Sequence, residues 1–182
     1  MLILIGKTAS GKDAIRNELK TKYGFTKVVG YTTRPIREGE IDGDTYYFIS
    51  NEEFEEKKNA GFFSEWKEYD TVQGKWCYGT SEESLLNADL NMVVILTPAG
   101  YRDVKEKLPS TAKVAYIYAN NATITERLMK RGDDAKEAQR RLESDNADFR
   151  GIEFQVDKIF YNNQKNNLAE VVDNLVAWYV KD

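Results

Sequence analysis

The feature that most restricts the fold of this chain stands at its start, where an apolar strand leads through a glycine-rich turn into a helix. Leu2–Ile5 forms the strand, residues 6–12 read Gly-Lys-Thr-Ala-Ser-Gly-Lys, and a helical pattern begins at Asp13. The glycines let the backbone N–H groups of the turn point inward, and the helix directs its positive end at the same place. The lysine adds a mobile positive charge, so the pattern predicts a loop that binds phosphate groups. The residues expected to contact these groups are Gly6, Thr8, Ala9, Ser10, Gly11, Lys12, Asp13 and Ala14.

The loop departs from the usual pattern at one position. Asp13 occupies the place where a Ser or Thr hydroxyl normally contacts magnesium. A carboxylate is a harder and more highly charged magnesium ligand than a hydroxyl. We therefore expect Asp13 to bind Mg²⁺, which would be the cofactor that accompanies the bound phosphates.

Composition excludes several classes of protein. The chain has 182 residues, 41% of them hydrophobic and 31% charged, which fits one globular domain with a buried core. Its net charge of -4 argues against a general nucleic-acid binder or a membrane-surface protein, so we expect neither kind of partner. The single cysteine, Cys77, excludes an internal disulfide and fits a cytoplasmic protein. The absence of histidine excludes Ser-His and Cys-His catalysis but leaves phosphoryl transfer open.

Strand and helix patterns alternate along most of the chain. The apolar runs 93–96 and 112–118 are typical of central parallel strands that are covered on both faces, and a stretch of helical character follows each of them. This alternation predicts an α/β fold with a doubly wound parallel sheet. Residues 31–80 break the alternation with short, aromatic, strand-rich pieces, so we expect an inserted subdomain there. The core would then comprise about 1–30 and 81–182.

A second group of positive charges lies in a polar loop. Arg34 and Arg37 lie on either side of Pro35, which restricts the backbone between them. Both guanidinium groups can therefore point at one multiply charged anion. Arginines in a surface loop more often only face solvent, and the pair by itself does not decide between these interpretations.

The wider sequence around these arginines resembles the guanylate kinase family. Residues 32–40 read Thr-Thr-Arg-Pro-Ile-Arg-Glu-Gly-Glu, and Gly43 and Tyr46 follow as they do in that family. There this loop binds the phosphate of the acceptor GMP, while the P-loop holds the donor ATP. The resemblance covers nearly the whole chain and implies a nucleoside monophosphate kinase that phosphorylates GMP or dGMP. The acceptor-binding residues that it implies are Arg34, Arg37, Tyr46, Glu65, Tyr78 and Thr80.

The resemblance assigns recognition of the base to Glu65 and Thr80. Glu65 matches the carboxylate that accepts from the N1 and exocyclic amine of guanine, and Thr80 matches a hydroxyl near the base. Guanine is the common base whose pairing edge offers adjacent donors to a carboxylate, so the chemistry agrees. The alternative for Glu65 is an exposed strand carboxylate without a function.

The resemblance also implies a helical lid at about 127–145 that closes over the transferred phosphoryl group. Arg131 and Arg141 match the lid arginines of the family, and Arg140 is an alternative to Arg141 because the spacing is shorter than usual. Guanidinium groups there would neutralise charge on the equatorial phosphoryl oxygens. Asn162 falls where the family places the adenine of ATP. The catalytic residues are accordingly expected to be Lys12, Arg34, Arg131 and Arg141.

The chain lacks a carboxylate pair that the family usually carries. An Asp-x-Asp pair normally precedes a glycine at the end of a strand, but here residues 95–100 read Ile-Leu-Thr-Pro-Ala-Gly. Those carboxylates serve metal binding and base recognition, so we hypothesise that Asp13 replaces the missing metal ligand. Gly30 stands where the family usually has Ser near the guanine O6, which would weaken base discrimination.

Two other functions remain open. Ribose 1,5-bisphosphate phosphokinases resemble guanylate kinases, carry Gly-Lys-Asp in the P-loop and lack the Asp-x-Asp pair, as this chain does. They do not share the full acceptor loop or the Glu-Trp pair that begins here at Glu65. A silent binding module of the same fold would hold a phosphorylated or acidic protein segment, but such modules characteristically lose the P-loop. The sequence therefore favours GMP or dGMP as the acceptor.

Overall fold

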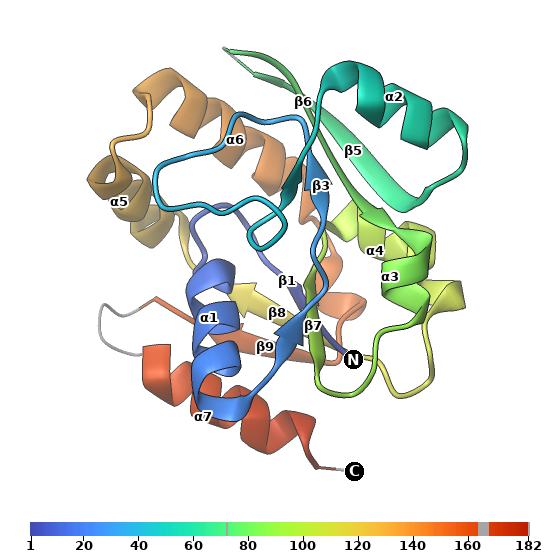
Figure 1. The fold of residues 1–182 in the computed structure, drawn as a ribbon. Coiled ribbons are helices and arrows are strands. Elements are labelled where there is room, and N and C mark those ends of the chain that lie inside the picture. The colour runs from blue at the N-terminus through green and yellow to red at the C-terminus, as the bar shows by residue number, and fades with distance from the viewer. Residues whose placement is uncertain (72, 164–167, 182) are drawn as a thin grey trace. The chain divides into compact units, whose positions relative to one another are not determined.

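The computed structural model describes residues 1–71, 73–163 and 168–181. Internal contacts divide the chain into two compact units. The first comprises Met1–Lys27, Leu90–Pro98 and Thr111–Asp182, and the second comprises Val28–Asp89 and Ala99–Ser110. Each unit contains its own β-sheet (Figure 1).

The first unit is built on a five-stranded sheet in the order β2-β7-β1-β8-β9, and every neighbouring pair is parallel. The strand β1 is central, with Leu2 opposite Val93 on one side and opposite Lys113 on the other. The elements of this unit are β1 (Leu2–Ile5), α1 (Lys12–Tyr23), β2 (Thr26–Lys27), β7 (Met92–Ile95), β8 (Lys113–Tyr118), α5 (Asn121–Arg131), α6 (Ala135–Asp148), the 3-10 helix η2 (Ile152–Phe154), β9 (Lys158–Tyr161) and α7 (Leu168–Tyr179).

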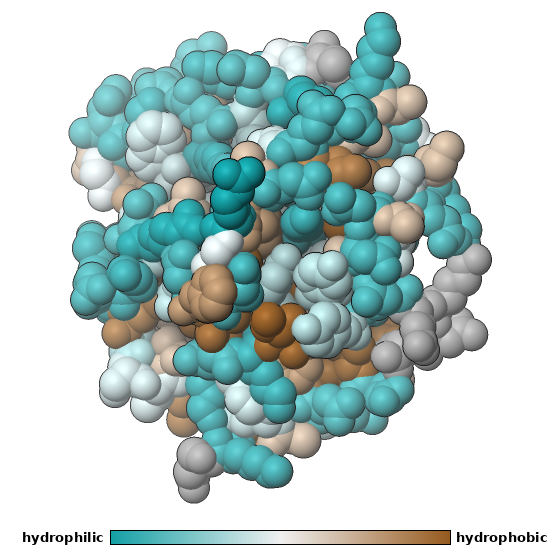
Figure 2. Space-filling model, turned by 180° about the vertical axis from the view of Figure 1, so that it is seen from behind, coloured by the Kyte–Doolittle hydropathy of each residue, from teal (hydrophilic) through white to brown (hydrophobic). Residues whose placement is uncertain are grey.

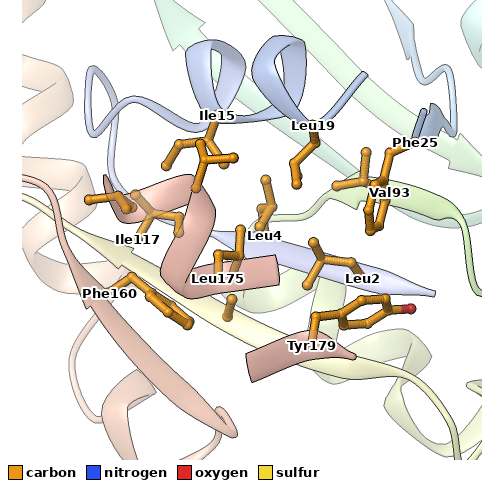
Figure 3. Packing of buried hydrophobic residues seen from close by; sticks show 13 residues of the cluster. Leu2, Leu4, Ile15, Leu19, Phe25, Val93, Ile117, Phe160, Leu175 and Tyr179 are labelled. Atoms are coloured by element: carbon orange, nitrogen blue, oxygen red, sulfur yellow. The ribbon is translucent and has the colours of Figure 1, made fainter. Parts of the chain in front are cut away.

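Helices cover both faces of this sheet, as the sequence predicts. On one face Leu2 and Leu4 of β1 pack against α1 and α7, which contribute Leu19 and Leu175 to the same fully buried cluster (Figure 3). Successive residues of a strand point to opposite faces. On β8, Ala115 belongs to that cluster, and the ring of the next residue, Tyr116, contacts Phe149 at the end of α6 with 5.6 Å between ring centroids. The predicted doubly wound α/β fold is therefore confirmed.

The second unit holds a four-stranded sheet in the order β4-β3-β6-β5. The long hairpin of β5 and β6 is antiparallel, β6 also pairs antiparallel with β3, and β3 pairs parallel with β4. The elements of this unit are β3 (Tyr31–Thr32), β4 (Tyr47–Phe48), α2 (Asn51–Asn59), β5 (Phe63–Thr71), β6 (Gly74–Ser81), α3 (Glu82–Leu86), the part of α4 (Pro98–Val104) from Ala99 on, and the 3-10 helix η1 (Lys105–Lys107).

The strand β6 lies almost wholly within residues 31–80, for which the sequence predicts strand-rich pieces without marking this strand separately. Its residues show no clear alternation, and Gly79 in its interior weakens a strand signal. The structure gives the reason for this glycine, because a Cβ there would lie 2.9 Å from the ring of Phe63 on β5. Close approach of a neighbouring side chain therefore outweighs strand propensity at this position.

In the described part of the chain, every helix is too short or too polar to cross a bilayer. Figure 2 shows hydrophilic residues over most of the face that it draws, with hydrophobic residues in separate groups.

Candidate functional site

The predicted phosphate loop follows the carboxyl end of β1, and both of its glycines are required by the geometry. A Cβ on Gly6 would lie 2.5 Å from the Ser10 Oγ and 2.6 Å from the Ile117 carbonyl oxygen. Gly11 has a φ of 101°, in the left-handed region, and a Cβ there would lie 2.3 Å from the Asn162 Nδ2. Larger residues at either position would therefore distort the loop.

The ammonium group of Lys12 lies inside this loop. Its Nζ donates to the carbonyl oxygens of Gly6 at 2.6 Å and Lys7 at 2.8 Å. Burial lowers the pKa of the Lys12 ammonium, and the negative charges of Asp13 and Asp145 oppose that shift. A positive charge is thus held at the centre of the loop, as the motif predicts.

Two side chains brace the loop from later parts of the first unit. The Arg127 guanidinium donates to the carbonyl oxygens of Ala9 at 3.1 Å, Ser10 at 3.2 Å and Asn162 at 2.9 Å. The Asn162 Nδ2 donates to the Ser10 carbonyl oxygen at 2.8 Å. The sequence analysis gave Arg127 no role, because only the tertiary fold brings it to the loop. The adenine contact of Asn162 remains a prediction.

Asp13 lies in the first turn of α1, directly after Lys12. Its Oδ1 accepts from the Arg16 guanidinium at 2.9 Å, and its side chain is 72% exposed. Among the described residues, no group of three or more acidic, histidine or cysteine side chains is arranged to hold a metal. Magnesium in phosphate-binding enzymes usually takes only one or two carboxylates and completes its shell with substrate phosphates and water. A single exposed carboxylate beside the phosphate loop fits that requirement.

The predicted lid arginines are held by acidic partners within the first unit. Arg131 donates to both carboxylate oxygens of Asp133, and a guanidinium nitrogen of Arg141 lies 3.8 Å from the same carboxylate. Arg140 and Arg141 both donate to Glu137, at 2.9 Å and 2.6 Å. The hydrogen bonds from Arg140, together with those from Arg141, lower the pKa of Glu137 to about 2 although burial opposes them. Arg131 and Arg141 thus share Asp133, and the choice between Arg140 and Arg141 as the second lid arginine remains a prediction.

The acceptor loop in the second unit holds Arg34 in a fixed position. Its guanidinium is almost fully buried and forms two hydrogen bonds to the Glu40 carboxylate, at 2.9 Å and 2.7 Å. Its Cζ also lies over the rings of Tyr46 at 5.9 Å and Phe48 at 5.5 Å. Burial would lower the pKa of Arg34, but the hydrogen bond and charge of Glu40 raise it overall. Arg34 is therefore a pre-organised cation.

The rest of the loop is tied to the neighbouring strand. The hydroxyl of Thr32 donates to the Cys77 carbonyl oxygen at 2.9 Å, and the Thr33 hydroxyl accepts from the Cys77 N–H at 2.9 Å. Arg37, whose N–H donates to Glu40 at 2.8 Å, is exposed. The two threonines of the motif thus hold the backbone that precedes Arg34 against strand β6.

Glu65 and Thr80 form a buried pair across strands β5 and β6. They stand opposite each other in the ladder, next to a bulge between Phe63 and Glu65, and the Thr80 hydroxyl donates to Oε1 of Glu65 at 2.6 Å. Burial raises the pKa of Glu65 to about 7, with Thr80 opposing the shift and Asp103 adding to it. Glu65 is therefore buried and not the exposed strand carboxylate that was its alternative, while its contact with a base remains a prediction.

The absence of a side chain at Gly100 leaves room for the Glu65 carboxylate. A Cβ on Gly100 of α4 would lie 2.3 Å from Oε2 of Glu65 and 2.9 Å from its Cδ. Glu65 therefore packs on bare backbone. At Gly30 a Cβ would meet the Gly79 carbonyl oxygen at 3.2 Å and the Tyr46 ring at 3.7 Å, so a larger residue there would need a small shift.

The second unit brings together most of the predicted acceptor residues. Tyr78 and Thr80 lie two apart on β6 and so share a face, and the Tyr78 ring packs edge-on against that of Tyr46 at 5.9 Å. Arg34 has an electrostatic interaction and a hydrogen bond with Tyr78. A guanidinium and tyrosines therefore occur in the same unit as the Glu65 carboxylate.

A glycine-lysine phosphate loop after the first strand of a parallel sheet, together with an arginine loop on a second sheet, defines the class of P-loop nucleotide kinase folds. Comparison with known proteins identifies the family within that class. The pattern described as guanylate kinase matches residues 1–178, and the chain belongs to the guanylate kinase family.

Individual relatives agree with this assignment. A guanylate kinase of Wolinella succinogenes is 39% identical over 145 residues, which are 75% of this chain and 64% of that protein. One from Symbiobacterium thermophilum is 36% identical over 142 residues, 76% of this chain and 65% of the relative. These matches thus span just under two thirds of the length of those relatives. One from Syntrophus aciditrophicus is 30% identical over 98% of this chain and 84% of its own length.

A solved structure shows the same fold. The crystal structure of guanylate kinase from Anaplasma phagocytophilum has a TM-score of 0.69 to this chain, with 22% sequence identity, and the match covers all of this chain and 86% of that one. The arrangement of strands and helices described above is therefore that of a known family member.

Proposed function

We propose that the protein transfers the γ-phosphoryl group of Mg-ATP to GMP or dGMP in the cytoplasm. The observation that carries this proposal is the buried Glu65–Thr80 pair, because a carboxylate can accept from both guanine donors at once. The pre-organised guanidinium of Arg34 in the same unit supplies a partner for the acceptor phosphate. The names of the relatives and the single buried cysteine, Cys77, are consistent with this assignment and compartment.

The proposed chemistry needs no protein base, since the attacking oxygen of the acceptor phosphate is already ionised. Lys12 would neutralise charge on the donor phosphates, and Arg131 and Arg141 would do so on the transferred group. Asp13 would hold the magnesium ion, which supplies further neutralisation of the β- and γ-phosphate oxygens. Arg34 would hold the acceptor in line, and domain closure would exclude water.

Turnover with a panel of acceptors tests the proposal. Purified protein with Mg-ATP is incubated separately with GMP, dGMP, AMP, UMP and ribose 1,5-bisphosphate, and ADP formation is followed. Turnover with GMP or dGMP, well above that with AMP or UMP, is the expected result. The proposal fails if no acceptor other than the sugar phosphate is phosphorylated, or if none is.

A second candidate is a kinase that acts on another phosphorylated acceptor, such as ribose 1,5-bisphosphate. The observation that favours it is Asp13 in the P-loop, together with the absence of the strand carboxylate pair at residues 95–97. The buried Glu65–Thr80 pair would then have no base to recognise. The sugar phosphate arm of the panel decides between the two candidates.

Removing the charge of Asp13 should show whether it replaces the missing metal ligand. We expect Asp13→Asn to lower kcat by about a hundred-fold and to raise the magnesium concentration needed for half-maximal rate, since the amide is a weaker magnesium ligand. Glu18→Gln, on the same helix, is the charge-matched control and should change neither value. The magnesium dependence of turnover measures the effect, and an unchanged dependence would remove Asp13 from the metal site.

Filling the space at Gly100 should weaken acceptor binding without unfolding the protein. The added methyl of Gly100→Ala would displace the Glu65 carboxylate, and alanine is otherwise favoured over glycine in a helix. We expect KM for GMP to rise by about ten-fold, equivalent to one lost hydrogen bond, with KM for ATP unchanged. Steady-state kinetics and a thermal melt measure both quantities. An equal rise in the two KM values would show a general defect instead.

A further inference from the structure

A carboxylate from helix α6 contacts the phosphate loop of the first unit. Asp145, in the last turn of that helix, accepts through Oδ2 from the backbone N–H of Thr8 at 2.6 Å. The next residue, Asn146, accepts through Oδ1 from the Nζ of Lys7 at 2.6 Å. Two neighbouring side chains of α6 thus hold the first half of the loop. One of them places a negative charge where the loop would receive a phosphate.

The charged groups around Asp145 are those of the anion site itself. Burial raises the pKa of its carboxyl group, while the Thr8 N–H and the charges of Lys12 and Lys7 oppose that rise, and Asp148 adds to it. Asp145 in turn is one of the two carboxylates that act on Lys12. The P-loop motif does not include Asp145, and the proposed transfer reaction assigns it no part.

The geometry points to Asp145 as a donor-site residue that sets the affinity for nucleotide by competing with its phosphates for the loop. The inference rests on the proposed function only in that the loop binds nucleotide phosphates. The single hydrogen of the Thr8 N–H is committed to the carboxylate. A phosphate placed beside that carboxylate also meets a like charge at short range. Nucleotide binding therefore displaces the carboxylate, and the lost contact weakens the observed affinity.

A purely structural role makes the opposite prediction. If the bond between Thr8 and Asp145 only supported the loop, its removal would loosen the loop and weaken nucleotide binding. Two substitutions separate these roles. Asp145→Asn keeps an oxygen that can accept from Thr8 but removes the charge, whereas Asp145→Ala removes both.

Calorimetric titration of the intact protein with Mg-ATP, in the absence of an acceptor, measures the effect. We expect both variants to bind Mg-ATP about ten-fold more tightly than the original protein, since an adjacent negative charge is lost. The control is Glu143→Gln, which removes one charge from the same helix. Glu143 accepts from Gln139 and lies two residues from Asp145, so the two side chains do not share a face. The affinity of the Glu143→Gln variant for Mg-ATP should stay within two-fold of that of the original protein.

Unchanged or weaker binding by both Asp145 variants would overturn the inference, as would an equal gain in Glu143→Gln. Circular dichroism of each variant establishes that the fold is intact. The acceptor panel is a separate measurement. Tighter Mg-ATP binding by the variants without GMP turnover by the original protein would support the role of Asp145 and reject the proposed function. GMP turnover without tighter Mg-ATP binding would support the proposed function and reject the role of Asp145.

Discussion

Lys12→Met should lower kcat for GMP phosphorylation by about a thousand-fold, the scale seen when one charge-stabilising group is removed from a transfer site. The Lys12 ammonium lies inside the phosphate loop and donates to the Gly6 and Lys7 carbonyl oxygens. Its positive charge would stabilise the negative charge that develops on the oxygens of the transferred phosphoryl group. Methionine keeps most of the length of the side chain and removes only the charge and the donors, so packing changes little.

Lys7→Met is the matched control for this prediction. Lys7 belongs to the same loop and carries the same charge, but its Nζ donates to the side chains of Asn121 and Asn146 instead of to the loop carbonyls. Its loss should change kcat by less than about ten-fold. Pre-steady-state or steady-state ADP formation measures both variants at saturating substrate. If Lys12→Met retained a tenth or more of the original kcat, Lys12 would not be a catalytic residue, and another group would have to neutralise the phosphates.

The sequence predicts the phosphate loop well because the loop is local. Its glycines, its lysine and the flanking strand and helix lie within one short stretch, and their spacing alone encodes the turn. The side chains that hold the loop in place could not be predicted from the sequence in this way. Arg127 and Asp145 reach it from helices that are more than a hundred residues further along the chain. No periodicity or motif connects such distant residues, so only the tertiary structure assigns them.

The acceptor side shows the same division between local and long-range information. The arginine loop and its threonines were recognisable as a motif, and the structure adds that Glu40 holds Arg34. The pairing of Glu65 with Thr80 depends on the register of a hairpin whose second strand the sequence did not reveal. The bulge beside Glu65 and the bare backbone at Gly100 also set the position of its carboxylate. The proposed recognition of the base would therefore depend on packing as much as on residue identity.

If Glu65 binds the base as proposed, its raised pKa should make acceptor binding depend on pH. Guanine offers two donors, so it would bind the ionised carboxylate, and burial raises the pKa of Glu65 to about 7. Below that value, protonation competes with GMP, and kcat/KM for GMP should fall about ten-fold for each pH unit. Above it, kcat/KM should level off, because Glu65 is then already ionised. The pH dependence for ATP should lack this step.

Glu65→Gln separates this titration from that of the acceptor, whose phosphate has a second pKa of about 6. The amide offers one acceptor oxygen and no charge, so kcat/KM for GMP at high pH should fall by about ten- to a hundred-fold, the value of hydrogen bonds to a charged group. The step near pH 7 should vanish while that of the acceptor phosphate remains. Glu68→Gln, at a half-buried residue of the same strand that pairs with Lys58 and Lys75, is the control and should keep the original profile. A profile that is identical in Glu65→Gln and the original protein would show that Glu65 does not face the base, and the assignment of guanine as the acceptor base would lose its main support.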